Sequence, residues 1–176
     1  LHLDLNSRNY DSAHALREEL AKHLELWEKI YGDQHQSKAL EERFYHIIRM
    51  AFEQTGQRVV VLVDEYDKPL LQAIGNENLQ AEFRATLKAF YSVLKTQDRY
   101  IRLGFLTGVT KFGKVSVFSD LNNLFDLSMD ERYQALCGIT EEEIHRYFEP
   151  TLHQLAEKNR ISYEEACDRL KRRYDG

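Results

Sequence analysis

The sequence predicts an α/β domain of the doubly wound type with a mainly parallel sheet, followed by a small helical subdomain. Three observations lead to this fold class. Strand-like apolar runs alternate with amphipathic helical patterns along most of the chain. One of these runs, Val59–Val63, has no polar residue, and the chain from about residue 139 onward is helical in pattern throughout. Alternation of strands and helices favours parallel strands that are joined by helical crossovers.

The first elements follow from local periodicity. Apolar and polar residues alternate over residues 1–5, as expected of a strand. Apolar residues then recur at helical spacing over residues 16–31 and again over residues 40–52. Gly32 and Gly56 follow these two patterns directly, and glycine is a common helix terminator. We therefore expect one strand and then two helices.

Val59–Val63 is the clearest strand of the sequence. It is continuous and rich in β-branched residues, so we expect a central strand that is buried on both faces, as in a parallel sheet covered by helices. The apolar spacing over residues 79–94 predicts a third helix. Residues 101–106 predict another strand, and residues 133–137 predict a weaker one.

The C-terminal part differs because its pattern is entirely helical. The sequences that begin at Thr140 and at Ser162 have the form of capping boxes, which mark the start of two helices. We therefore divide the chain into an α/β core at residues 1–138 and part of a helical subdomain at residues 139–176.

Composition limits the possible partners. A net charge of −5 argues against non-specific binding of nucleic acid. No stretch approaches the roughly 20 apolar residues of a membrane span, so we expect no membrane partner. Cys137 and Cys167 lack the spacing of a metal site, and we interpret them as reduced thiols of a cytoplasmic protein.

The strongest candidate site is the acidic segment Asp64-Glu65-Tyr66-Asp67, which directly follows the apolar strand. Open α/β sheets carry their chemistry at the carboxyl ends of the strands. In a nucleoside triphosphatase, Asp64 would bind Mg²⁺ through water, and Glu65 would orient and polarise the attacking water. The structural alternative is that these acids only solvate a strand end.

Further candidates lie beside this segment. Asp67 and Lys68 either pair across the turn before Pro69 or contact a partner. Thr107 and Thr110 follow the next predicted strand, where P-loop ATPases carry a polar residue that senses the γ-phosphate. Either threonine could fill that role, or both could satisfy backbone groups of a turn.

The string Gly108–Lys114 has the glycine and lysine spacing of a phosphate-binding loop, but we do not interpret it as one. The next residue is Val115, where a true loop carries the Ser or Thr that binds Mg²⁺. The string also follows the acidic strand, whereas the phosphate loop precedes it in this fold class. Lys111 and Lys114 remain candidates to add positive charge near the nucleotide. We expect the phosphate loop to lie before Leu1, with this chain a truncated domain.

Several segments together resemble the bacterial AAA-ATPase-like family, whose members are often joined to a C-terminal nuclease of the restriction-endonuclease type. The most specific are Val-Leu-Val-Asp-Glu-Tyr-Asp-Lys-Pro-Leu at residues 61–70 and Ser-Asp-Leu-Asn-Asn-Leu within residues 115–124. The other segments that carry the resemblance are residues 3–5, 106–112, 138–144 and 174–176.

The resemblance implies a P-loop ATPase core that uses ATP and Mg²⁺. Asp64 and Glu65 match the magnesium-binding and water-activating acids of the Walker B segment, and Thr107 or Thr110 matches the sensor position. The helical tail looks like the lid of such ATPases. Nucleic acid would be a partner only through the suspected nuclease, which this chain lacks.

Two rival functions remain. A helicase is suggested by the DExD form of residues 64–67, although the Ser-Ala-Thr string of such enzymes is replaced by Leu106-Thr107-Gly108. A nucleotide-gated interaction module without turnover is the other, with self-association or a protein partner. The phenylalanines that could contact such a partner, or else pack in the core, are Phe112, Phe118 and Phe125.

Overall fold

The computed structural model describes most of the chain, and its contacts divide it into two compact units, Leu1–Leu124 and Phe125–Gly176, each of which is described by itself. The described residues are 1–32, 39–109, 117–118, 124–128, 130–133, 135–136 and 138–174.

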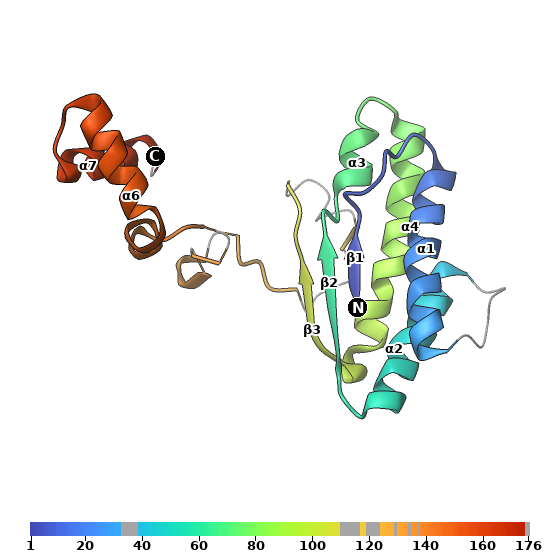
Figure 1. Cartoon of the computed structure of the whole chain (residues 1–176). Helices are drawn as coiled ribbons and strands as arrows, with labels where there is room; N and C mark the ends of the chain where they lie inside the picture. Colours follow the sequence, from blue (N-terminus) through green and yellow to red (C-terminus); the bar gives the residue numbers. More distant parts are fainter. Residues whose placement is uncertain are drawn as a thin grey trace. The chain divides into compact units, whose positions relative to one another are not determined.

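The first unit is a mixed α/β structure (Figure 1). Its elements, in chain order, are β1 (His2–Asp4), α1 (Ala13–Tyr31), α2 (Leu40–Thr55), β2 (Val59–Asp64), α3 (Lys68–Gln72), α4 (Glu77–Thr96), the 3-10 turn η1 (Asp98–Tyr100) and β3 (Ile101–Leu106). The three longer helices and the strands lie where the apolar periodicity predicted them. The short helix α3 was not predicted, because Pro69 indicated a turn, yet proline is tolerated in the first turn of a helix.

The strands form one parallel sheet in the order β1-β2-β3. His2 is paired with Leu62 across the first ladder, and Val61 is paired with Gly104 across the second. The prediction that Val59–Val63 forms a central parallel strand is therefore confirmed. Parallel pairing brings the carboxyl ends of all three strands to the same edge of the sheet.

The burial of β2 differs from the prediction. Its residues alternate between buried and exposed, and Val60 and Leu62 retain 38% and 39% of their accessible surface. Leu103 of β3, which pairs with Val60, is 50% exposed. The prediction of burial on both faces is thus wrong for the part of the chain that the structure describes. An unbroken apolar run fits a strand covered on both faces, but in the part of the chain that the structure describes this outer face stays partly exposed.

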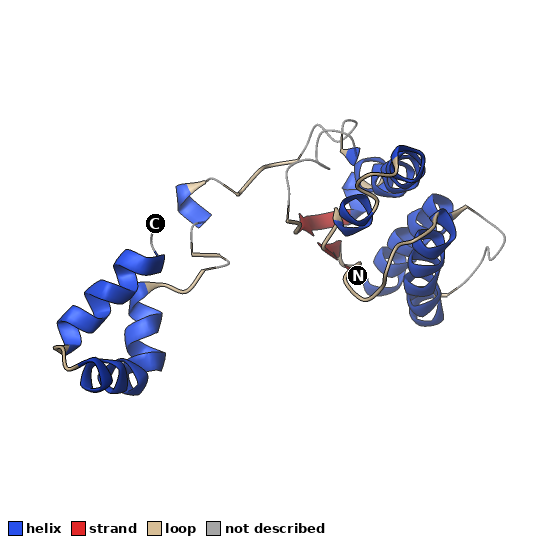
Figure 2. Cartoon of the chain, turned by 90° about the horizontal axis from the view of Figure 1, so that it is seen from above, coloured by secondary structure: helices blue, strands red, loops and turns tan. Residues whose placement is uncertain are grey.

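The helices α1, α2 and α4 lie on one side of the sheet, as Figures 1 and 2 both show. Their apolar faces and the inner face of the sheet form the core, in which Leu20 and Phe83 are completely buried. Phe44 of α2 stacks on Phe90 of α4 with ring centroids 4.5 Å apart. Trp27 of α1 contacts the same Phe44 ring at 5.8 Å. Aromatic side chains thus join all three helices.

A buried ion pair also connects α1 to α2. The Arg43 guanidinium donates to both carboxylate oxygens of Glu28, at 2.8 and 2.7 Å. Only about a tenth of each side chain is exposed, at 10% for Arg43 and 9% for Glu28. Two parallel hydrogen bonds of this kind satisfy charges that would otherwise be costly to bury.

The second unit is helical, with the 3-10 turn η2 (Glu131–Tyr133), α6 (Glu141–Asn159) and α7 (Tyr163–Tyr174). The capping box of Thr140 and Glu143 is present in both directions, and Ser162 accepts a hydrogen bond from the Glu165 amide. The weak strand predicted at residues 133–137 is wrong where the structure describes it, because Tyr133 ends a 3-10 turn and residues 135–136 are turn-like. Short apolar runs of this length do not distinguish strands from short helical segments.

The three phenylalanines proposed as partner contacts have different outcomes. Phe118 is 6% exposed and packs against Tyr66 and Tyr91, so it belongs to the core. Phe125 is 68% exposed, and Phe112 lies outside the described residues.

Across the ranges that the structure describes, no helix has the length and apolar character needed to cross a membrane.

Candidate functional site

The candidate site lies at the carboxyl edge of the sheet, where β2 ends at Asp64. Asp64 is exposed, and its Oδ1 accepts a hydrogen bond from the Thr107 hydroxyl. The backbone fixes this pair, since the Thr107 amide donates to the Val63 carbonyl at 2.8 Å and the Tyr66 amide donates to the Thr107 carbonyl at 2.9 Å. The ladder between β2 and β3 therefore continues just far enough to bring the two predicted residues together.

Glu65 turns the chain away from the strand. Its backbone has a φ of 56°, in the left-handed region that residues with a side chain rarely adopt. Its carbonyl accepts from the Lys68 amide at 3.0 Å, which closes the turn before α3. Adjacent residues of a strand point to opposite faces, so Asp64 and Glu65 can reach the same site only if the strand ends between them. β2 ends at Asp64, which meets this condition.

The turn after β2 also contacts the loops on both sides of it. The Asp67 side chain accepts a hydrogen bond from the Val109 amide, at 3.1 Å, in the loop after β3. The Lys68 ammonium donates to the Asn6 carbonyl at 2.8 Å and to the Asn6 side chain, in the loop after β1. The earlier alternatives for this pair were a mutual contact across the turn or contact with a partner. The structure adds a third, in which each side chain holds a different loop.

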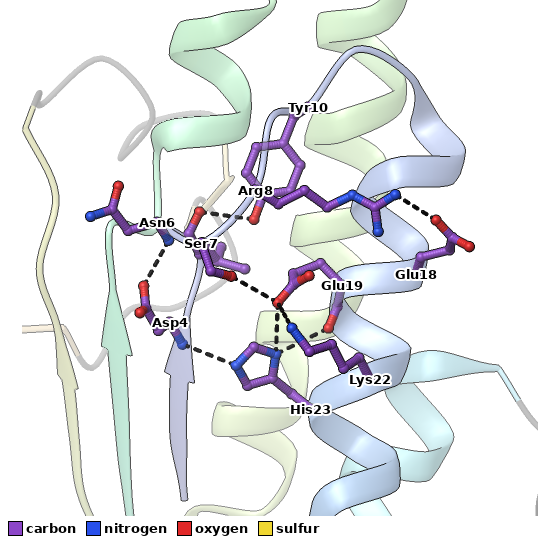
Figure 3. A network of polar contacts seen from close by, with 10 residues as sticks. Asp4, Asn6, Ser7, Arg8, Tyr10, Glu18, Glu19, Lys22 and His23 are labelled. Carbon is purple, nitrogen blue, oxygen red and sulfur yellow. Dashed lines mark hydrogen bonds and ion pairs between the residues drawn. The ribbon is translucent and has the colours of Figure 1, made fainter.

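A polar network holds the loop after β1 against α1 (Figure 3). Asp4 ends β1 beside Asp64, its register partner, and its Oδ1 accepts from the Asn6 amide at 2.7 Å. The Asp4 amide donates to Nε2 of His23 at 3.4 Å. The other ring nitrogen of His23, Nδ1, lies 3.0 Å from the Glu19 carbonyl and 3.5 Å from the Glu19 carboxylate, so this ring connects β1 to α1.

Glu19 lies at the centre of this network. It is 2% exposed, and Oε1 accepts from the Ser7 hydroxyl at 3.1 Å and from the Lys22 ammonium at 3.3 Å. A buried carboxylate is tolerated when it is paired and hydrogen-bonded. Nearby, the Tyr10 hydroxyl donates to the Leu5 carbonyl at 2.9 Å, and burial is the main cause that raises the pKa of this phenol above its ordinary value. These contacts anchor the loop after β1 beside the site.

Two of the predicted site residues, Thr110 and Lys111, lie outside the described residues, as does most of the Gly108–Lys114 string. The predicted residues that the structure places are Asp64, Glu65 and Thr107, and it brings all three to the carboxyl edge.

Comparison with known proteins identifies a family whose sequence pattern this chain matches. The family described as "AAA-ATPase_like: Predicted AAA-ATPase" matches residues 1–118, which is more than half of the chain and includes β1, β2, β3 and the acidic turn. The chain belongs to the AAA-ATPase-like family. This match supports the resemblance drawn from the sequence and the ATPase-like character that it implies.

The AAA-ATPase-like chain also has a curated relative, named "Uncharacterized protein in vnfD 5'region", from Azotobacter chroococcum mcd 1. The two are 44% identical over 140 residues, which is 80% of this chain and 27% of the relative. The chain thus spans about a quarter of that protein. No solved structure matches the chain.

An ATPase implies Mg²⁺, and the chemistry of the donors tests whether the described residues fit it. No group of three or more His, Cys, Asp or Glu side chains among them could hold a metal ion. Asp64 nevertheless offers an exposed carboxylate beside the Thr107 hydroxyl, and both are oxygen donors. Mg²⁺ in phosphate-transfer sites keeps several waters and takes one or two carboxylates plus the substrate phosphates. One carboxylate beside one hydroxyl is the kind of donor set that a largely hydrated magnesium ion would need, and it does not suit an all-protein cage.

Sequence reasoning missed Asp4 and Asn6 as part of this edge. Asp4 lies inside the strand predicted at residues 1–5, whereas the structure ends β1 at this residue, so its position in the sequence did not indicate a site. The contact between Asn6 and Lys68 was not indicated either, because the two residues are 62 positions apart.

Proposed function

We propose that this chain is part of the ATP-binding and ATP-hydrolysing domain of an AAA-like ATPase, and that it carries the Walker B and sensor segments. The observation that carries the proposal is the hydrogen bond from Thr107 to the Asp64 carboxylate, at the end of the central strand of a chain in the AAA-ATPase-like family. Central strands of parallel sheets present functional residues at this edge.

Each residue has a separate role in the proposed reaction. Asp64 would hold Mg²⁺, largely through water, and the ion would supply positive charge that offsets the charge of the ATP phosphates. Glu65 orients the attacking water and accepts its proton. Thr107, with Thr110 as the alternative, senses the γ-phosphate through its hydroxyl. Because Thr107 donates to Asp64, the sensor and the metal-binding acid are linked before nucleotide arrives.

The rest of the nucleotide site would come from outside the described residues. We propose that the phosphate-binding loop precedes Leu1 in the full-length protein, and that Lys111 adds positive charge near the phosphates. The relative from Azotobacter is about four times as long as the matched region. In that protein, sequence outside the matched region is long enough to contain further parts of a nucleotide site. A helical layer over the exposed Val60 and Leu62 would complete a doubly wound fold, with the C-terminal helices as the lid.

We expect this chain alone to bind ATP–Mg²⁺ weakly or not at all. The phosphate loop supplies the backbone donors and the lysine that hold the β- and γ-phosphates, and Asp64 by itself offers one contact to a well-hydrated ion. Isothermal titration calorimetry with ATP and Mg²⁺ measures this directly. Micromolar affinity for the chain would mean either that Gly108–Lys114 is a phosphate loop after all, or that the fold is not of the P-loop type.

Replacing Asp64 with Asn in the full-length protein is expected to weaken Mg²⁺-dependent ATP binding at least tenfold, because the amide removes the charge that favours the ion. The matched control is Asp98→Asn, an exposed aspartate of η1 at the amino end of β3. ATP affinity should be measured with and without Mg²⁺ for both variants. Equal metal dependence in Asp64→Asn and wild type would remove Asp64 from the proposed role.

Turnover by the full-length protein separates the two remaining functions. Steady hydrolysis of ATP supports the ATPase. Binding of ATP–Mg²⁺ with no measurable hydrolysis would instead favour the nucleotide-gated interaction module, in which the same residues recognise nucleotide without releasing phosphate.

A further inference from the structure

Asp67 occupies a helix-capping position but does not act as a cap. It directly precedes α3, where an aspartate normally accepts hydrogen bonds from the first amides of the helix. Its side chain makes no such bond, and the residue is completely buried. Its Oδ1 instead accepts from the Val109 amide, 42 positions along the chain. A side chain that breaks its local rule marks a place where another requirement has prevailed.

Gly108 shows how closely the two loops approach. A Cβ atom added to Gly108 would lie 2.6 Å from Oδ1 of Asp67 and 2.6 Å from the Tyr66 ring. Such distances are far inside van der Waals contact, so only glycine fits without movement. The loop after β3 therefore rests directly on the turn that follows Asp64 and Glu65.

The contact lies one step from the proposed chemistry. Thr107, whose hydroxyl donates to Asp64, is followed directly by Gly108 and Val109. The Asp67 carboxylate thus holds the chain on the far side of Thr107, while the strand ladder holds it on the near side. Lys68 makes the corresponding connection to the loop after β1 through Asn6.

We propose that Asp67 is a positioning residue, which fixes the loop after β3 so that the Thr107 hydroxyl stays on the Asp64 carboxylate. This inference rests on the proposed ATPase function and adds a residue to its site. Asp67 itself touches neither water nor phosphate in this scheme. Its removal should lower kcat, because displacement of a positioned group by about 1 Å is enough to slow a reaction strongly.

The test uses the full-length protein and three variants. Asp67→Ala removes the acceptor, Asp67→Asn keeps an acceptor oxygen at the same place, and Gly108→Ala pushes the loop away without altering Asp67. Gly56→Ala is the matched control, because Gly56 is a left-handed glycine at the end of α2 with open space around an added Cβ. The measured quantities are kcat, KM, the melting temperature and the hydrogen-exchange rate of the Val109 amide.

We expect Asp67→Ala and Gly108→Ala to lower kcat at least tenfold and to speed Val109 exchange at least about tenfold, the scale for a lost hydrogen bond to a charged acceptor. Asp67→Asn should recover most of both values. Gly56→Ala should lower the melting temperature by a few degrees and leave kcat unchanged. If Asp67→Ala does not fold, Gly108→Ala and Asp67→Asn carry the comparison.

Two results would overturn the inference, and both can be told apart from failure of the proposed function. If the wild type hydrolyses ATP and kcat is unchanged in Gly108→Ala and Asp67→Ala, Asp67 has no positioning role. If the exchange rate of the Val109 amide is unchanged in both variants, the contact between Asp67 and Val109 does not exist in solution. Absence of ATP turnover in the wild type, with Val109 exchange still accelerated by Asp67→Ala, would overturn the ATPase and leave Asp67 a structural contact only.

Discussion

Replacing Glu65 with Gln in the full-length protein is expected to slow ATP hydrolysis by about 10² to 10⁴-fold, which is the usual effect of losing a positioned base. The affinity for ATP should stay within about twofold of the wild-type value. Gln keeps the size of Glu and loses its basicity, so contacts to bound ATP–Mg²⁺ survive and proton acceptance does not. Single-turnover kinetics beside equilibrium binding of ATP separates the two effects.

The comparison needs a glutamate that changes in the same way without touching the site. Glu25→Gln serves, since Glu25 is exposed on α1 and lies outside the carboxyl edge. It should hydrolyse ATP at the wild-type rate. If Glu65→Gln does the same, Glu65 is not the base, and its left-handed turn has a structural role only.

Breaking the buried ion pair between α1 and α2 is expected to destabilise the folded protein strongly. Arg43→Met should lower the free energy of unfolding by roughly 3–5 kcal/mol, because it leaves the Glu28 carboxylate buried without its bidentate partner. That is a large share of the roughly 5–15 kcal/mol that stabilises a typical domain. Urea unfolding followed by circular dichroism provides the measurement.

Two further variants identify the cause. The double variant Glu28→Leu, Arg43→Met removes both charges and should recover most of the loss, since an apolar pair of similar volume is often as stable as a buried ion pair. Arg49→Met breaks the pair between Arg49 and Glu53, in which the two side chains are 49% and 46% exposed, and should leave the free energy of unfolding nearly unchanged. A loss in Arg49→Met as large as in Arg43→Met would show that burial is not the reason.

The fold was predictable where the determining pattern is local. The helices α1, α2 and α4 bury one face each, so their apolar residues recur at helical spacing, and Gly32 and Gly56 end the first two. Strand β2 was recognised by its unbroken apolar run, but the same run fits a strand covered on one face or on two. Which faces are covered depends on other parts of the protein, and no local pattern of β2 records that.

The candidate site also has residues that a local pattern predicts and contacts that no local pattern predicts. Asp64 and Glu65 were found because they directly follow an apolar strand, and Thr107 because it follows the next one. The contacts of Asp67 with Val109 and of Lys68 with Asn6 could not be predicted, since each joins two loops that only the parallel pairing of the strands brings together. Turn residues next to a proline give no indication of a partner more than forty positions away.

The carboxyl edge is assembled from residues that are far apart in the chain, and this has a kinetic consequence. Asn6 and Lys68 are 62 positions apart, and Asp64 and Thr107 are 43 apart. Contacts of this range form only after long loops have closed, whereas helices acquire their hydrogen bonds locally and fast. During refolding the helical layer should therefore appear before the edge does. The ability to bind nucleotide would be among the last properties that the domain acquires. Its appearance during refolding would therefore indicate that the native state has formed.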